Sequence, residues 1–197
     1  MSHNFMNNSN VLSYIKNNKI LCATSIVHLF YDGVTNMHYL LFTLWQQQFG
    51  LSMGQVGMLK MLFTGAMSAL QIPAGEFGRI SGERKVLIGG TLLISTSLLL
   101  YAYISSMFSL VVLIILAGIS ASVQHPLASS FISRHYSSEQ TRVALSTYNF
   151  FGDVGKRSTP FFIFFVTHIN GLGYRHTLYC FSWYLCLLCP SIPVTKG

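Results

Sequence analysis

Charged side chains are scarce in this chain. Only 9% of its 197 residues are Asp, Glu, Lys or Arg, and five of these are acidic, whereas soluble domains average about 25% charged residues. Apolar types make up 51% of the chain, and its mean hydropathy is +0.50. A soluble fold of this composition would expose too much apolar surface. The scarcity of charge therefore excludes an ordinary soluble domain and favours an integral membrane protein.

Cysteines and catalytic motifs are also few. The four cysteines all lie in apolar surroundings, so no disulfide framework is predicted. Cys186 and Cys189 have redox or metal spacing, but no second pair and no ligand-spaced histidine accompanies them. The sequence contains no nucleophile–base signature, Walker loop, zinc-spaced cluster or dinucleotide fingerprint. We therefore expect no enzyme activity, no cofactor and no metal site.

The net charge of +7 raises the possibility of nucleic-acid binding. Nucleic-acid binders gather Lys and Arg on one solvated face. In this chain the basic residues lie instead in short loops between apolar stretches. We expect no nucleic-acid partner, and the lipid bilayer explains the pattern better.

Six apolar stretches are each long enough for a membrane helix, which needs about 20 residues, and Gly- or Ser-rich turns separate them. A cleaved signal peptide is not expected, because the first stretch is too long and Asp32 interrupts it. We predict an all-α integral membrane bundle over residues 20–190, with tails at 1–19 and 191–197. The predicted spans are 20–45, 55–74, 86–104, 108–132, 143–168 and 174–190.

Basic residues alternate with these spans. If the spans cross in turn, one side of the membrane carries eight Lys and Arg, and the other side carries only Arg175. The positive-inside rule then places both termini in the cytoplasm of a cell whose inner membrane holds the chain. The eight are Lys16, Lys19, Arg79, Arg84, Lys85, Arg134, Arg142 and Lys196.

A polar stripe follows one face of the first stretch, with steps of three or four residues. His28, Asp32 and Asn36 form its centre. At 1.5 Å per residue, Asp32 lies near the middle of the membrane. A charge there costs about 2.5–3.5 kcal/mol and usually marks a substrate or ion path. Asp32 is thus a functional candidate, and a purely structural hydrogen-bonding role is the alternative.

The fifth stretch contains three formal charges, in Gly152-Asp153-Val154-Gly155-Lys156-Arg157. Asn149 and Asp153 lie one turn apart. Asp153 can meet Lys156 or Arg157 along the helix, three or four residues on. Such a pair is either self-neutralised and merely cheaper to insert, or part of a proton or substrate site. One cation stays uncompensated, and Asp32 is a candidate for its counter-charge.

The fourth stretch places Gln124 and His125 directly before Pro126. Proline frees a backbone carbonyl, so these side chains either satisfy the backbone or orient a substrate or water. The third and sixth stretches have no charged residue in their interiors. We expect those two helices to face lipid and the other four to surround a polar interior.

Together these segments resemble the N-terminal half of a major facilitator superfamily transporter, and in detail its fosmidomycin-resistance-like branch. The resemblance covers roughly residues 20–176. The segments at 118–126 and 148–156 are its most specific part. The segments that carry it are 28–36, 49–57, 71–75, 118–126 and 148–156.

The resemblance implies a bundle of two inverted three-helix repeats and secondary active transport of a small solute or drug by alternating access, coupled to protons. Asp32 and Asp153 would be the proton-linked carboxylates. Lys156 and Arg157 would compensate charge or contact an anion. The pathway would also include His28, Asn36, Gln124, His125 and Asn149.

One expected motif departs from the family pattern. The loop after the second helix usually reads G-x-L-A-D-R-x-G-R-R in the superfamily. Here Gly75, Gly82 and Arg84 are kept, but Arg79 stands at the aspartate position and Glu83 at a basic one. A gating role for Gly75, Arg79, Gly82 and Arg84 is therefore an open hypothesis.

The length suggests one half of a transporter. Family members have two six-helix halves, and the composition here changes after Thr177. We expect a truncated gene product, with a shifted reading frame as one cause, that needs a missing C-terminal half or a second copy. The alternative is a non-transporting membrane component or the inactive remnant of a broken transporter gene.

Overall fold

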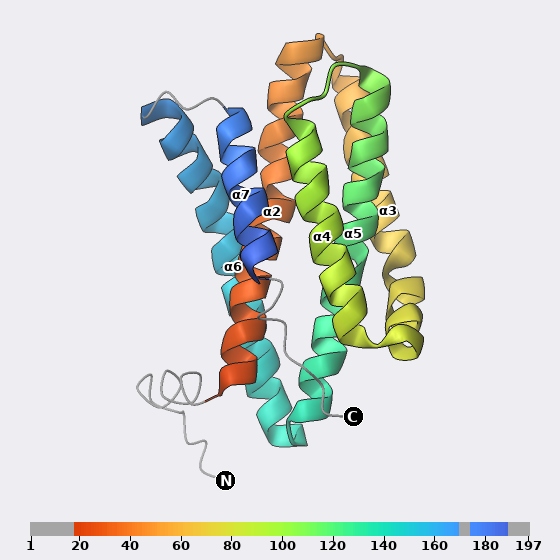
Figure 1. Ribbon diagram of the computed structural model, residues 1–197, viewed down its shortest axis with the longest axis vertical. Coiled ribbons are helices and arrows are strands. Elements are labelled where there is room, and N and C mark those ends of the chain that lie inside the picture. Colours follow the sequence, from red (N-terminus) through yellow and green to blue (C-terminus); the bar gives the residue numbers. More distant parts are fainter. Residues whose placement is uncertain (1–17, 170–173, 189–197) are drawn as a thin grey trace.

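The structure is a computed structural model that describes residues 18–169 and 174–188. Every regular element in these residues is an α-helix, and successive helices run in alternating directions (Figure 1). Most of the predicted tails, with Lys16 and Lys196, lie outside the described residues, as do Cys189 and Pro190 at the end of the sixth predicted span. The helices are α2 (Lys19–Phe49), α3 (Met53–Ser81), α4 (Glu83–Tyr101), α5 (Met107–His135), α6 (Ser138–Ile169) and α7 (Tyr174–Leu188).

Local capping chemistry sets several helix ends close to the predicted turns. Ser52 and Ser106 each cap a helix and form capping boxes with Gln55 and Ser109, which satisfies backbone N–H groups that a helix start leaves free. Gly50 ends α2 in the left-handed conformation, at φ 61°, a region that glycine enters at little cost. These positions match the sequence signals for turns.

The predicted gating loop is mostly helical. The sequence motif predicts a loop after the second span, but α3 continues to Ser81, and Gly82 alone connects it to α4 at φ 95° and ψ 120°. Pro73 lies inside α3 without ending it. Gly78 packs directly on Leu127 of α5, so this glycine marks a close helix contact rather than a turn.

The helices pack in pairs. The most extensive contacts join α2 to α6 and α3 to α5, and α4 packs on α5 and α7. Trp45, Phe63 and Tyr101 are fully buried within the main apolar core. Ser182 of α7 donates a hydrogen bond to the carbonyl of Ser95 on α4, at 2.8 Å. The start of α2 and the α3–α4 and α5–α6 connections lie at one end of the bundle (Figure 1), so the basic residues near them gather there.

Two helices of the described residues, α4 and α5, are long and apolar enough to cross a membrane by length and composition. The polar face of α2 and the charges of α6 lower the mean hydropathy of those helices. The all-helical fold is as expected, and the prediction of six spans stays a prediction.

Candidate functional site

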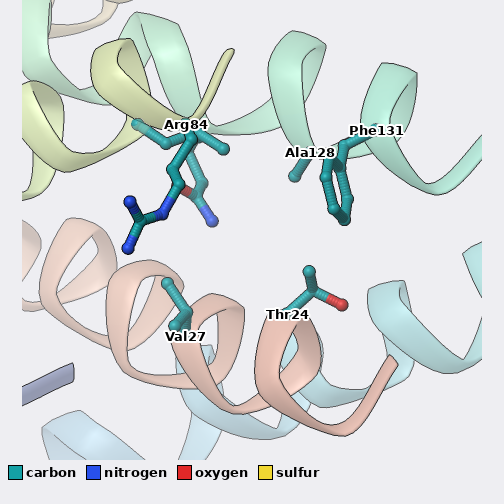
Figure 2. A pocket seen from close by; sticks show the side chains of 7 residues that line it. Thr24, Val27, Arg84, Ala128 and Phe131 are labelled. Atoms are coloured by element: carbon teal, nitrogen blue, oxygen red, sulfur yellow. The ribbon is translucent and has the colours of Figure 1, made fainter. Parts of the chain in front are cut away.

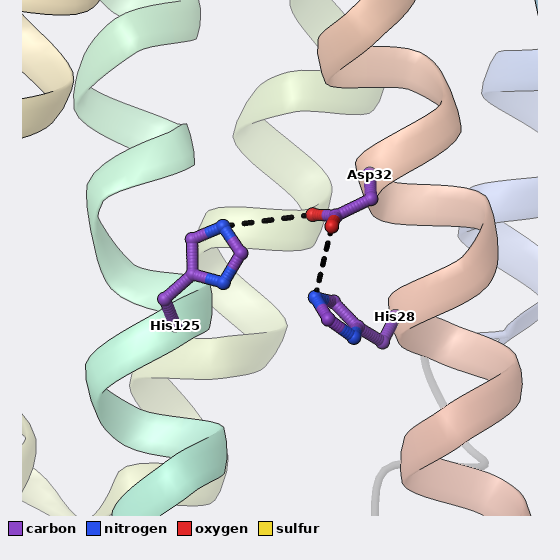
Figure 3. Close-up of side chains that lie close together, drawn as sticks. All are labelled: His28, Asp32 and His125. Carbon is purple, nitrogen blue, oxygen red and sulfur yellow. Dashed lines mark ion pairs between the residues drawn. The ribbon is translucent and has the colours of Figure 1, made fainter. Parts of the chain in front are cut away.

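Asp32 lies at the centre of a cluster of polar side chains from three helices. Its carboxyl group is 1% exposed. His28, one turn earlier on α2, places Nε2 3.1 Å from Oδ2. Lys156 of α6 places Nζ 3.0 Å from the same oxygen. His125 of α5 places Nε2 3.6 Å from Oδ1, and Figure 3 shows both imidazole rings directed at the carboxylate.

Glycines allow α6 to approach α2 closely enough for these contacts. A Cβ atom added at Gly152 would collide with His28 and Asp32, and one at Gly155 would overlap the backbone carbonyl of Leu29. Gly33 of α2 likewise leaves room for Thr159. Small residues permit such close helix contacts in membranes. The glycines around the charged segment of α6 therefore bring Lys156 within reach of Asp32.

Backbone contacts orient the cluster. His28 Nδ1 lies 2.9 Å from the carbonyl oxygen of Tyr148, and the two rings stack at 3.7 Å with an interplanar angle of 3°. The Asn36 amide donates to the carbonyl of Lys156 at 2.6 Å. Sequence reasoning missed Tyr148 as a site residue. The one feature of the sequence that points to Tyr148 is its position one turn before Gly152, on the same face of the helix.

The charged segment of α6 divides between the cluster and the surface. Lys156 lies 3.3 Å from Asp153, the spacing anticipated along the helix. Asp153, however, is 69% exposed. The cation that contacts Asp32 is Lys156. Arg157 and Asn149 are exposed, and Arg157 forms no ion pair with another described side chain. Of the four residues, only Lys156 contacts the buried carboxylate directly.

Gln124 is buried next to the cluster and lines a small cavity between α2, α5 and the start of α4. The cavity measures about 20 Å³, room for about one water molecule. Figure 2 shows Arg84 and Val27 toward one end and Thr24, Ala128 and Phe131 toward the other. Arg84 thus reaches this cavity between the helices.

The other predicted gating residues lie at the end of α3. Exposed Arg79 donates to Glu76 at 3.0 Å and 2.5 Å. This contact lowers the pKa of Glu76 and raises that of Arg79. Glu83 is buried and pairs with Arg134 at the end of α5. Glu83, which stands at a basic position of the expected motif, therefore pairs with a basic residue on another helix.

Comparison with known protein families identifies the family to which this chain belongs. A model described as Major Facilitator Superfamily matches residues 24–190. The chain belongs to the Major Facilitator Superfamily. Members of this superfamily are membrane transporters and not enzymes, so the chain is a membrane protein of a transporter family. A comparison with curated proteins finds no match.

The superfamily match includes all four residues of the cluster and continues through α7. The cluster combines one buried carboxylate with three nitrogen groups that can carry positive charge or donate a lone pair. Such a constellation has the chemical groups to hold a proton or a cation between helices. Its lysine is anchored on α6, and His125 lies on α5.

Proposed function

We propose that this superfamily member is a secondary active transporter of a small solute or drug, that it works by alternating access, and that it is coupled to protons. The contact between buried Asp32 and Lys156 carries the proposal. A charged carboxylate in the middle of a membrane helix is costly in free energy, and such residues usually mark an ion or substrate path. Membership of the fosmidomycin-resistance-like branch is part of the proposal.

The proposed roles follow the positions of the side chains. Asp32 is the main proton-linked carboxylate, and Asp153 is a second carboxylate that shares Lys156 with it. Lys156 compensates charge inside the cluster, and Arg157 contacts an anion or a partner surface. His28, Asn36, Gln124, His125 and Asn149 complete the proposed path, with six membrane spans and both termini in the cytoplasm of the inner membrane.

A complete transport path also requires a second six-helix half, which would be a missing C-terminal half or a second copy. Asp153 and Arg157 support this part of the proposal because both are exposed charges in the middle of α6. An exposed charge in the membrane is stable only against a protein or water-filled surface.

The test is proton flux in proteoliposomes. The purified chain is reconstituted around a pH-sensitive dye and given a panel of small solutes and drugs that includes fosmidomycin. We expect solute-dependent proton movement that Asp32→Asn abolishes. Lys60→Met is the control, because Lys60 lies outside the cluster near Tyr39, 5.9 Å from its ring centre. The absence of flux with every solute would favour a non-transporting membrane component or an inactive remnant.

A further inference from the structure

The orientation of His28 leaves one ring nitrogen facing a carboxylate. A carbonyl oxygen only accepts hydrogen bonds, so the contact between His28 Nδ1 and the Tyr148 carbonyl at 2.9 Å places the hydrogen on Nδ1. The other ring nitrogen, Nε2, faces Asp32, where it donates a hydrogen bond when it carries a hydrogen and offers a lone pair to a metal ion when it does not. The stacked Tyr148 ring holds this orientation.

A ring nitrogen and a carboxylate oxygen therefore meet in a buried space. His28 Nε2 lies 3.1 Å from Asp32 Oδ2, and the two side chains are 2% and 1% exposed. Nε2 has no hydrogen bond of normal geometry. Either a proton or a metal ion between the two atoms can satisfy both of them, because each can donate a lone pair to it. The same two atoms can therefore serve as a ligand pair for a metal ion.

His125 supplies a third ligand atom from another helix. Its Nε2 lies 3.6 Å from Asp32 Oδ1, and single ligand atoms of the three residues all lie within 4.8 Å of one another. In a tetrahedral site with metal–nitrogen bonds of 2.0–2.1 Å, neighbouring ligand atoms are about 3.4 Å apart. The 3.1 Å from His28 runs to Oδ2 and the 3.6 Å from His125 runs to Oδ1, so each histidine lies near that spacing from one oxygen of the carboxylate (Figure 3).

We propose that His28, Asp32 and His125 bind a divalent first-row transition-metal ion such as Zn²⁺ or Co²⁺, and that Lys156 leaves Asp32 when the ion binds. Three protein ligands leave a fourth position for water or another ligand. The bond from His28 Nδ1 to a backbone carbonyl is the support that metal-ligating histidines usually have. Two imidazoles with one carboxylate favour transition metals over Mg²⁺ and Ca²⁺, which prefer oxygen ligands.

Lys156 acts as a resident competitor for the site. Its ammonium lies 3.0 Å from Asp32 and 3.3 Å from Asp153, so a short movement of its flexible side chain exchanges one carboxylate for the other. A divalent ion bound to Asp32 would repel the Lys156 ammonium. The ammonium could then pair with the Asp153 carboxylate alone. The half-exposed side chains of His125 and Lys156 give the ion a path to the site.

The proposal concerns equilibrium binding and does not depend on transport. Purified chain in detergent is titrated with Co²⁺, and visible absorption reports a tetrahedral site. Zn²⁺ is measured by competition with a chromophoric chelator. We expect one ion per chain, with Mg²⁺ unable to compete. Binding without proton flux would contradict the proposed transport alone, and flux without binding would contradict this inference alone.

Matched variants test each part of the site. His125→Ala should weaken Co²⁺ affinity at least about tenfold, whereas His135→Ala, at an exposed histidine of the same helix, should not. Lys156→Met should tighten affinity about tenfold or more because the competitor is gone, and Lys60→Met should leave it unchanged. Asp153→Asn should weaken affinity, since the displaced ammonium loses its alternative partner.

Two results would overturn the inference. One is Co²⁺ affinity that is equal in the wild type, His125→Ala and Lys156→Met. The other is the absence of binding in folded wild type, Lys156→Met and Asp153→Asn alike. Circular dichroism and gel filtration establish which variants are folded, and His125→Ala, at a half-exposed side chain, keeps the test decisive if Lys156→Met does not fold.

Discussion

Lys156 on α6 forms an ion pair with Asp32 on α2, 124 positions earlier in the chain, with Nζ 3.0 Å from Oδ2. The two side chains differ in environment, because the carboxylate is buried and the ammonium is half-exposed. Asp32 is therefore the member that depends on its partner. This difference in burial determines how substitutions at the two positions affect the stability of the chain.

Lys156→Met should destabilise the chain by about 1–3 kcal/mol, because it leaves a buried carboxylate without its main cation. Asp32→Asn together with Lys156→Met should recover part of the loss. The measurement is a double-mutant cycle from denaturant titrations in mixed micelles. Additive effects of the two substitutions would show that the pair contributes no coupling.

Gly155→Ala should separate α2 from α6, because its new methyl group would overlap the Leu29 backbone carbonyl. Backbone cannot rotate away as a side chain does, so we expect a loss of about 1–3 kcal/mol and a lower melting temperature. Gly89→Ala is the control, since that helical glycine has open space around it. Equal melting temperatures for the two variants would contradict the close contact.

Gly82→Ala should weaken the α3–α4 connection. At φ 95° and ψ 120° an L side chain is strained, and such a residue costs about 1–3 kcal/mol. The matched control is Gly57→Ala, in the interior of α3 with nothing near its Cβ position. Thermal unfolding of both variants measures the difference. If both substitutions leave stability unchanged, the one-residue connection is wrong.

Glu83→Gln should destabilise the bundle measurably, whereas Glu76→Gln should not. Each glutamate pairs with an arginine, but Glu83 is buried and its partner Arg134 lies on another helix. Exposed pairs within one helix contribute little. Denaturant titrations of both variants make the comparison. A larger effect from Glu76→Gln would reverse our assignment of the important pair.

The pH dependence at Glu76 has a definite sign. Arg79 lowers the pKa of Glu76, so any stability that this pair adds is present above the unfolded-state pKa of the glutamate. It is lost as pH falls through the lower folded-state pKa. We expect the difference in melting temperature between wild type and Arg79→Gln to vanish in acid. A difference that grows in acid would contradict the pairing.

Local periodicity predicted much of the fold. The stripe with His28, Asp32 and Asn36 is one face of α2, and Asp153 meets Lys156 at the spacing of one turn. Both are properties of a single helix, which a sequence displays directly. The spans also match the helix positions to within a few residues at most ends, because Ser and Gly caps mark those ends.

Contacts between helices were harder to predict. Nothing in the sequence chooses Lys156 over its neighbour Arg157 as the partner of Asp32, because that choice depends on how α6 is rotated against α2. The stack of Tyr148 on His28 and the position of His125 have the same origin. The histidines also lie 97 positions apart, so no local ligand spacing revealed the three-residue group.

The glycine contacts between α2 and α6 divide the cluster into a fixed part and an adjustable part. Since the Leu29 backbone touches Gly155, these two helices cannot slide past each other without breaking that contact, and the backbone positions of His28, Asp32 and Lys156 keep their spacing. His125 belongs to α5 and directly precedes Pro126, where a helix bends most readily. A bend of α5 at this proline would therefore change the distance from His125 to Asp32 without moving α2 against α6.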